Sequence, residues 1–261
     1  MVVNPSTPPA RRSGWPWQSL LDGVMLLLWA AVLIRFSLTG KLYLLIHPDY
    51  AGLAYLALVI LLLLGLGRLR QVWWSWRGPY ARPRSQEHNP LLPRQLTSGL
   101  LLAVAVFGLI YSPRPFNSQT AFQRGITDVL GQTRSRPQRF IVSTKPADRT
   151  IVDWVHTLNV YPEPDAYTNQ PVKVTGFVTP MPGWPDHIFM ISRFVLTCCA
   201  ADAYPVGLAV ALPVGTSPPQ PDSWLEVTGQ ITTVSLEGKR QVAIGSARLT
   251  PIPEPRTPYE Y

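Results

Sequence analysis

The segment Val172-Lys173-Val174-Thr175-Gly176-Phe177-Val178 alternates apolar and polar residues at its start, a pattern that predicts a β-strand. A second segment, Val227-Thr228-Gly229-Gln230-Ile231, resembles it. In both, a glycine follows Val-Thr. Glycine lets a strongly coiled strand bend, because it has no side chain to clash at the corner. The two segments together favour a small β-barrel of the OB type.

Three more segments have strand character, and turn residues separate them. The expected strands are residues 172–176, 188–196, 204–212, 224–233 and 241–249, with turns at 181–183, 213–223 and 237–238. A short helix should precede them over residues 150–159, with Thr150 as its N-cap and Asp153 at the third helical position. The predicted soluble domain is therefore a small all-β, OB-like barrel over residues 150–261. Its proline-rich tail, 251–258, should be extended.

Before this domain the chain contains three apolar segments, at residues 20–38, 50–67 and 95–111. A helix that crosses the bilayer core needs about 17–25 apolar residues. The second segment carries no charge, and Arg35 lies close enough to the end of the first to reach the interface. The third is uncharged but short, so it could instead be a buried or interfacial helix. These features predict a helical transmembrane region over residues 1–111 with about three spans.

Residues 112–149 are rich in Pro, Ser, Thr and Arg and predict a linker, with one short helix over 121–130. The lipid bilayer is the partner that the N-terminal apolar segments imply.

The positive charge of the chain is concentrated in its N-terminal half. Residues 1–111 contain ten basic and three acidic side chains, which account for +7 of the formal net charge of +8. The C-terminal domain is nearly neutral, which argues against a nucleic-acid partner.

The basic residues cluster in the N-terminal segment and in the 68–94 loop, which predicts that both face the cytoplasm. Trp15 and Trp17 precede the first apolar segment and Trp73, Trp74 and Trp76 follow the second, as an interfacial belt on that face requires. A third span would place the C-terminal domain outside the cytoplasm; without it, the domain would be cytoplasmic.

The two cysteines of the chain are adjacent, Cys198 and Cys199, and precede Asp202 by a few residues. Four roles are open to them. They could be small core hydrophobes, metal ligands, a vicinal disulfide, or a catalytic thiol whose pKa Arg193 lowers. Asp202 could serve as a turn-forming residue that hydrogen-bonds its own backbone.

The structural role is favoured, and a metal site comes next. Thiolates favour zinc or copper(I), and the candidate ligands are Cys198, Cys199, Asp202 and His187, with His156 more distant. Adjacent strand residues point to opposite faces, so both thiols could reach one ion only where the strand ends. The ligands lack zinc-finger spacing, so the cofactor is unknown, with zinc as one candidate.

Several short motifs of the chain resemble a family of uncharacterised bacterial membrane proteins typified by YcgQ. They are Gly40-Lys41-Leu42, Ile46-His47-Pro48, Gly176-Phe177-Val178, the segment 193–203, and Pro258-Tyr259. The most specific signature comprises Arg193, Phe194, Cys198, Cys199, Asp202, Pro205 and Gly207. The tryptophan- and arginine-rich segment 73–84 has no counterpart in this resemblance.

The resemblance implies a bacterial inner-membrane protein that pairs with a multi-helix permease of unknown substrate; in some bacteria the pair is linked to zinc starvation. The expected function is that of an accessory protein whose extracytoplasmic barrel contacts the permease or its cargo. The alternatives are a membrane protein that binds zinc or copper at Cys198 and Cys199, and a thiol-dependent enzyme. Since no phosphate-binding loop, paired-carboxylate site or Ser/His/Asp arrangement is recognisable, we expect a non-enzymatic protein.

Overall fold

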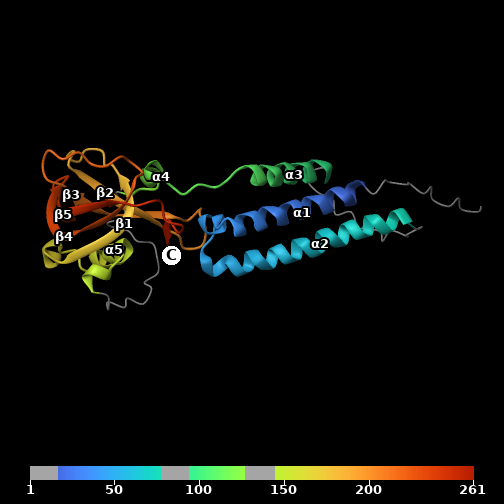
Figure 1. The fold of residues 1–261 in the computed structure, drawn as a ribbon, viewed down its shortest axis with the longest axis horizontal. Helices are drawn as coiled ribbons and strands as arrows, with labels where there is room; N and C mark the ends of the chain where they lie inside the picture. Colours follow the sequence, from blue (N-terminus) through green and yellow to red (C-terminus); the bar gives the residue numbers. More distant parts are fainter. Residues whose placement is uncertain (1–16, 78–93, 127–144) are drawn as a thin grey trace, which may run out of the picture. The chain divides into compact units, whose positions relative to one another are not determined.

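The computed structural model describes residues 17–77, 94–126 and 145–261 (Figure 1). The chain divides into two compact units. One comprises Met1–Thr39 and Gly52–Ser112, and the other comprises Gly40–Ala51 and Pro113–Tyr261. Trp15, the arginines at positions 11, 12, 82 and 84, and the linker residues 127–144 lie outside the described residues.

The first unit consists of three helices, α1 (Trp17–Leu38), α2 (Ala51–Arg77) and α3 (Arg94–Ile110). Two stretches, Ser19–Leu38 and Pro48–Arg77, are long and apolar enough to cross a membrane, and the apolar part of α3, Leu96–Ile110, is shorter. The prediction of apolar N-terminal helices is thus confirmed, with two of them as candidate spans.

Helix α2 continues beyond position 67, although arginines follow. The guanidinium of Arg70 lies 4.6 Å from the ring centre of Trp74, and that of Arg77 lies 3.7 Å from the ring centre of Trp73. These cation–π contacts between residues four apart stabilise the last turns of the helix.

The sequence suggested that Arg35 reaches the membrane interface, and the structure gives it partners within the protein. Its guanidinium donates hydrogen bonds to the carbonyl oxygens of Gly108 and Leu109, in the last turn of α3. A cation at the C-terminus of a helix is stabilised by the helix dipole and by carbonyl groups that have no partner within the helix. Arg35 therefore fastens the end of α3 to α1.

The second unit contains six strands and several short helices. The strands are β1 (Pro171–Thr179), β2 (Ile188–Val195), β3 (Tyr204–Ala211), β4 (Trp224–Leu236), β5 (Lys239–Pro251) and β6 (Tyr259–Glu260). The helices are η1 (Lys41–Leu44), η2 (Pro48–Tyr50), α4 (Ser118–Gln123), η3 (Pro146–Asp148), α5 (Ile151–Val160) and η4 (Pro164–Tyr167). All five expected strands are present. Strand β6 was not predicted, and α4 begins three residues before the helix expected at 121–130, whose last residues lie outside the described part.

The strands form one six-stranded sheet in the order β1-β4-β5-β3-β2-β6, and β1 also pairs with β2. The pairs β1–β2, β1–β4, β2–β3 and β4–β5 are antiparallel, whereas β3–β5 and β2–β6 are parallel. Following the pairings from β1 through β4, β5, β3 and β2 thus leads back to β1.

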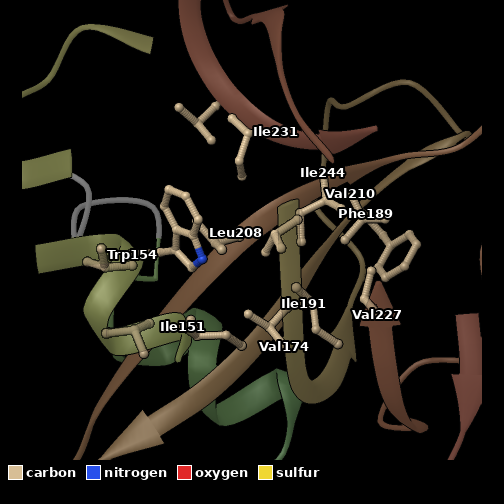
Figure 2. Packing of buried hydrophobic residues seen from close by; sticks show 14 of the residues in the cluster. Ile151, Trp154, Val174, Phe189, Ile191, Leu208, Val210, Val227, Ile231 and Ile244 are labelled. Atoms are coloured by element: carbon tan, nitrogen blue, oxygen red, sulfur yellow. The ribbon is translucent and has the colours of Figure 1, made fainter. Parts of the chain in front are cut away.

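Helix α5 begins with the capping box that the sequence predicts. The Thr150 hydroxyl accepts a hydrogen bond from the Asp153 amide at 3.2 Å, and the Asp153 carboxylate accepts one from the Thr150 amide at 3.0 Å. The helix lies beside the sheet and buries Ile151 and Trp154 completely. Figure 2 shows these two side chains among residues of the strands, including Leu208.

Strand β2 is buried along its whole length. Phe189 and Ile191 belong to the cluster that contains Trp154, whereas Met190 and Phe194 belong to a second cluster with Tyr259. Apolar packing on both faces explains why this strand has no alternation of polar and apolar residues.

The two glycines at the expected bends lie where two chain segments approach closely. A Cβ atom at Gly176 would lie 2.5 Å from the backbone oxygen of Ser192, and one at Gly229 would lie 2.6 Å from that of Gly245. The pairing of β4 with β5 is irregular between Thr228 and Gln230. Backbone atoms cannot move aside as a flexible side chain can, so both positions require glycine.

We expect Gly176→Ala to destabilise the second unit by about 2–3 kcal/mol, because the added methyl group overlaps a strand carbonyl. The measurement is thermal unfolding of the full chain in detergent, followed by near-ultraviolet circular dichroism. Gly67→Ala is the matched control, since a Cβ there meets no atom within 4 Å. An unchanged transition in Gly176→Ala would contradict the close approach of β1 and β2.

Candidate functional site

The Cys-Cys turn begins where β2 leaves the sheet. Phe194 and Val195 pair in parallel with Tyr259 and Glu260 of β6, and the Leu196 amide donates to the Glu260 carbonyl at 2.9 Å. Leu196 is buried, but the next two residues are exposed. The strand therefore ends before the cysteines, which is the condition under which two adjacent thiols can point the same way.

The carboxylate of Asp202 holds the turn together. It accepts hydrogen bonds from the amide of Cys198 at 2.8 Å, from the amide of Cys199 at 3.2 Å and from the Thr197 hydroxyl. Partial burial acts to raise the pKa of Asp202, but the hydrogen bonds from Cys198, Thr197 and Cys199 lower it to about 2. Asp202 thus has the turn-forming role that its position suggested.

The two thiols lie next to each other, with 3.7 Å between Cys198 Sγ and Cys199 Sγ. Neither forms a disulfide, and Cys198 is exposed. The hydrogen bond to Asp202, followed by that to Cys199, raises the pKa of Cys198 to about 12. A thiol in this state is a poor nucleophile, because the thiolate is the reactive form. The arrangement does not favour a thiol enzyme.

Three of the four expected ligands come together. The Sγ atoms of Cys198 and Cys199 and a carboxylate oxygen of Asp202 all lie within 4.8 Å of one another. His187 precedes β2, and its carbonyl accepts a hydrogen bond from the Leu212 amide. The eight residues of β2 separate it from the cysteines by about 26 Å at about 3.3 Å per residue. His156 lies on α5 and is not part of the group either.

Residues 45–47, which precede the domain by more than a hundred residues, pair with the Cys-Cys turn. Ile46, in the loop between α1 and α2, forms an antiparallel bridge with Cys199. The His47 amide donates to the Cys198 carbonyl at 2.9 Å, and the Ala200 amide donates to the Leu45 carbonyl at 2.8 Å. The loop is thus a short edge strand on the Cys-Cys turn.

The far end of the chain contacts the same loop. The Tyr261 hydroxyl donates to the Tyr43 carbonyl at 3.1 Å, and the rings of Tyr261 and His47 meet edge to face with centroids 5.2 Å apart. His47 Nδ1 accepts a hydrogen bond from the Asp49 amide at 3.1 Å. The His47 imidazole is therefore held in a defined position beside the turn.

Arg193 binds the C-terminal tail and not a thiol. Its guanidinium forms an ion pair with Glu260 at 2.6 Å and donates to the Thr257 carbonyl at 2.8 Å. Burial lowers the pKa of Arg193 against the opposing effect of Glu260, and burial raises the pKa of Glu260 against the effect of Arg193. Both groups are removed from water, so the pair depends on its close geometry.

The other signature residues lie in β2 and β3, the strands on either side of the turn. Pro205 pairs with Phe194 across β2 and β3, and a Cβ at Gly207 would lie 2.6 Å from the Met190 side chain. From outside the signature, Arg124 donates to the carbonyl oxygens of Ala200 and Ala203, at 3.1 and 2.6 Å.

Sequence reasoning missed His47, Arg124 and Tyr261 as parts of this site. For His47 a signal existed, since Ile46-His47-Pro48 is one of the motifs that carry the family resemblance. Arg124 and Tyr261 act through backbone carbonyls and rings, which leave no spacing pattern in the sequence.

Comparison with known proteins identifies the family. Residues 21–127 match the DUF1980 N-terminal domain, and residues 141–261 match the DUF1980 C-terminal domain. The chain belongs to the DUF1980 family. This confirms the resemblance drawn from the first loop and from the Cys-Cys segment. The junction between the two matches falls in the expected linker.

One curated relative covers nearly the whole chain. It is a protein of Streptococcus mutans serotype c named "Putative two-component membrane permease complex subunit". It is 23% identical over 261 residues, which are 86% of this chain and 93% of the relative. No solved structure matches the chain.

Tyr259 of β6 provides a test of how the C-terminal tail packs on the domain. It is 3% exposed, and its hydroxyl accepts a hydrogen bond from the Phe116 amide at 3.2 Å. Burial raises the pKa of Tyr259 from 10 to about 12. A raised pKa in the folded state means that its stability is present below pH 10 and is lost as the pH rises through 12.

Between pH 10 and 12, the wild-type chain should therefore lose about 2–3 kcal/mol more unfolding free energy than Tyr259→Phe. Denaturant unfolding of both proteins in detergent across this pH range measures the difference. Tyr167 and Tyr261 titrate in both proteins and cancel in the comparison. Parallel pH profiles would show that the Tyr259 hydroxyl is not buried.

Proposed function

We propose that this protein is an integral membrane accessory subunit that works with a partner permease. The observation that carries the proposal is the near full-length similarity to a relative named as a membrane permease complex subunit. The two long apolar helices supply a membrane anchor. Most apolar side chains of α2 are exposed, and most of those of α1 are half-buried. Such surfaces are available to lipid and to the helices of another membrane protein.

The C-terminal domain of this proposal is an OB-like barrel. Its support is the circuit of pairings from β1 through β2, β3, β5 and β4 back to β1, with β3 and β5 parallel. The close approaches at Gly176 and Gly229 fit strands that coil strongly to close such a barrel. OB barrels bind ligands on an exposed strand face and adjacent loops, and the Cys-Cys turn is one of the loops here.

The contacts of the first loop, residues 40–51, help to decide on which side of the membrane the domain lies. Residues Gly40–Ala51 belong to the same compact unit as the domain, so both lie on one side. That loop follows one crossing by α1, and α2 then returns to the opposite side. The chain can rejoin the loop only if α3 crosses as well, although its 17 residues span only about 25 Å. Arg35 of α1 supports the short helix at its end.

Three crossings and the distribution of basic residues favour a domain outside the cytoplasm. With three crossings, the N-terminal segment and the residues between α2 and α3 share the side opposite to the domain, and an excess of Arg and Lys marks the cytoplasmic face. The barrel would then contact the permease or its cargo at the outer surface of the inner membrane.

Cysteine accessibility in intact cells tests this orientation. In a Cys198→Ser/Cys199→Ser background, the reporter Ser217→Cys lies at an exposed position of the domain. We expect a membrane-impermeant maleimide to label it in intact cells whose outer layers admit the reagent. The matched control, Ser85→Cys in the 68–94 loop, should be labelled only after lysis. The reverse pattern would place the domain in the cytoplasm.

Co-purification tests the partner. We expect the tagged chain, extracted gently from membranes of its own host, to bring down a multi-span membrane protein in comparable amount. The same experiment with a chain ending at residue 112 removes the barrel and keeps the three N-terminal helices with the first loop. Loss of the partner would assign the contact to the barrel, whereas full retention would contradict a contact made by the barrel. Absence of any multi-span partner from the intact chain would refute the accessory role.

A further inference from the structure

The spacing of the two thiols suits a tetrahedral metal ion. Two thiolates bound to one zinc ion at about 2.3 Å each lie about 3.8 Å apart in tetrahedral geometry. Cys198 Sγ and Cys199 Sγ are 3.7 Å apart. Since adjacent residues of a regular strand would point away from each other, this distance is a product of the turn.

The turn is held firmly enough to keep that spacing. The Asp202 carboxylate binds the amides of both cysteines, and Arg124 binds the carbonyls of Ala200 and Ala203. One Asp202 ligand oxygen is also within 4.8 Å of both sulfur atoms. Preorganised ligands bind a metal with little rearrangement. The hydrogen bonds from Asp202 and Arg124 hold the turn in such a preorganised form.

His47 lies beside the three ligand atoms, although its ring nitrogens are not within 4.8 Å of all three. The register that pairs Ile46 with Cys199 sets His47 opposite Cys198. Directly opposed residues of an antiparallel pair project to the same face, with Cβ atoms about 4.5–5.5 Å apart. The His47 ring is packed against Tyr261, and its side chain is 16% exposed.

Asp49 can orient that imidazole for coordination. Its carboxylate lies 3.6 Å from His47 Nδ1. Histidine ligands commonly donate one ring N–H to a carboxylate while the other nitrogen binds the metal. In the structure Nδ1 accepts a hydrogen bond from the Asp49 amide, so a neutral ring carries its proton on Nε2. Metal binding at Nε2 would require that proton to move to Nδ1, where it could be donated to the Asp49 carboxylate in place of the bond from the amide.

We propose that Cys198, Cys199, His47 and Asp202 bind a thiophilic divalent cation of the zinc class, in a site shared between the first loop and the C-terminal domain. Binding forms two metal–sulfur bonds and one metal–nitrogen bond and releases two thiol protons to water. Metal binding does not depend on the permease partnership of the proposed function.

Cobalt(II) is the probe, because tetrahedral thiolate coordination gives it intense visible and charge-transfer absorption. The full-length chain, reduced and in detergent without oxygen, is titrated with cobalt and then with zinc in competition. We expect one equivalent of tetrahedral cobalt, displaced by zinc. Cys198→Ser and Cys199→Ser should each abolish the thiolate band or halve its intensity. A wild-type chain with no thiolate band would overturn the proposal.

Two histidine variants decide the ligand set. His47→Asn keeps a side-chain acceptor for the Asp49 amide but removes Nε2, so the loop cap is preserved. We expect it to weaken cobalt affinity by at least about tenfold, and Asp49→Asn to weaken it by about tenfold. His187→Ala, at the other end of β2, is the matched control and should bind as the wild type does.

Equal affinities for His47→Asn and wild type would remove the first loop from the site, and a loss confined to His187→Ala would overturn the assignment. Near-ultraviolet circular dichroism of each variant confirms that the domain remains folded. Because the titration needs no permease, failure here and failure of the co-purification are separate results.

Discussion

Two backbone hydrogen bonds between the first loop and the Cys-Cys turn are the constraint on which most of the architecture depends. They join residues 45–47 to residues 198–200, and they require segments on either side of α2 and α3 to share one compact unit. The chain must leave the β2–β3 pairing early for the turn to accept these bonds. That pairing ends at Val195, and the Leu196 amide donates instead to the Glu260 carbonyl of β6. The spacing of the thiols follows from the same departure.

Much of the domain was visible in the sequence because local patterns determine it. The alternation around Val174, the Val-Thr-Gly repeats and the Thr150–Asp153 capping box act over a few residues, and each predicted its element. Strand β6 could not be found in this way. Its two residues, Tyr259 and Glu260, are strand only because Phe194 and Val195 lie beside them, and no two-residue pattern contains that information.

The candidate site was predictable in part for the same reason. Cys198, Cys199 and Asp202 are close in sequence, and a turn of that length brings them close in space. His187 was a candidate because it is the histidine closest in sequence to the cysteines. The eight residues of the extended strand β2 separate it from them in space. His47 is far in sequence and near in space, and only the pairing of distant segments reveals it. Arg193, taken from the sequence as a partner for a thiol, is bound instead to the tail through Glu260.

The contact between Tyr43 and Tyr261 joins residues 218 positions apart. Contacts of such separation form late, because the loop they close must first be paid for in chain entropy. With the topology proposed above, the first loop emerges from the membrane long before the strands that it pairs with have been synthesised. Leu42, which is 3% exposed in the finished unit, remains without its packing partners during that interval. With that topology, a chain whose third helix failed to cross would leave its first loop and its last strand on opposite sides of the bilayer. Completion of the C-terminal domain would then require correct membrane insertion.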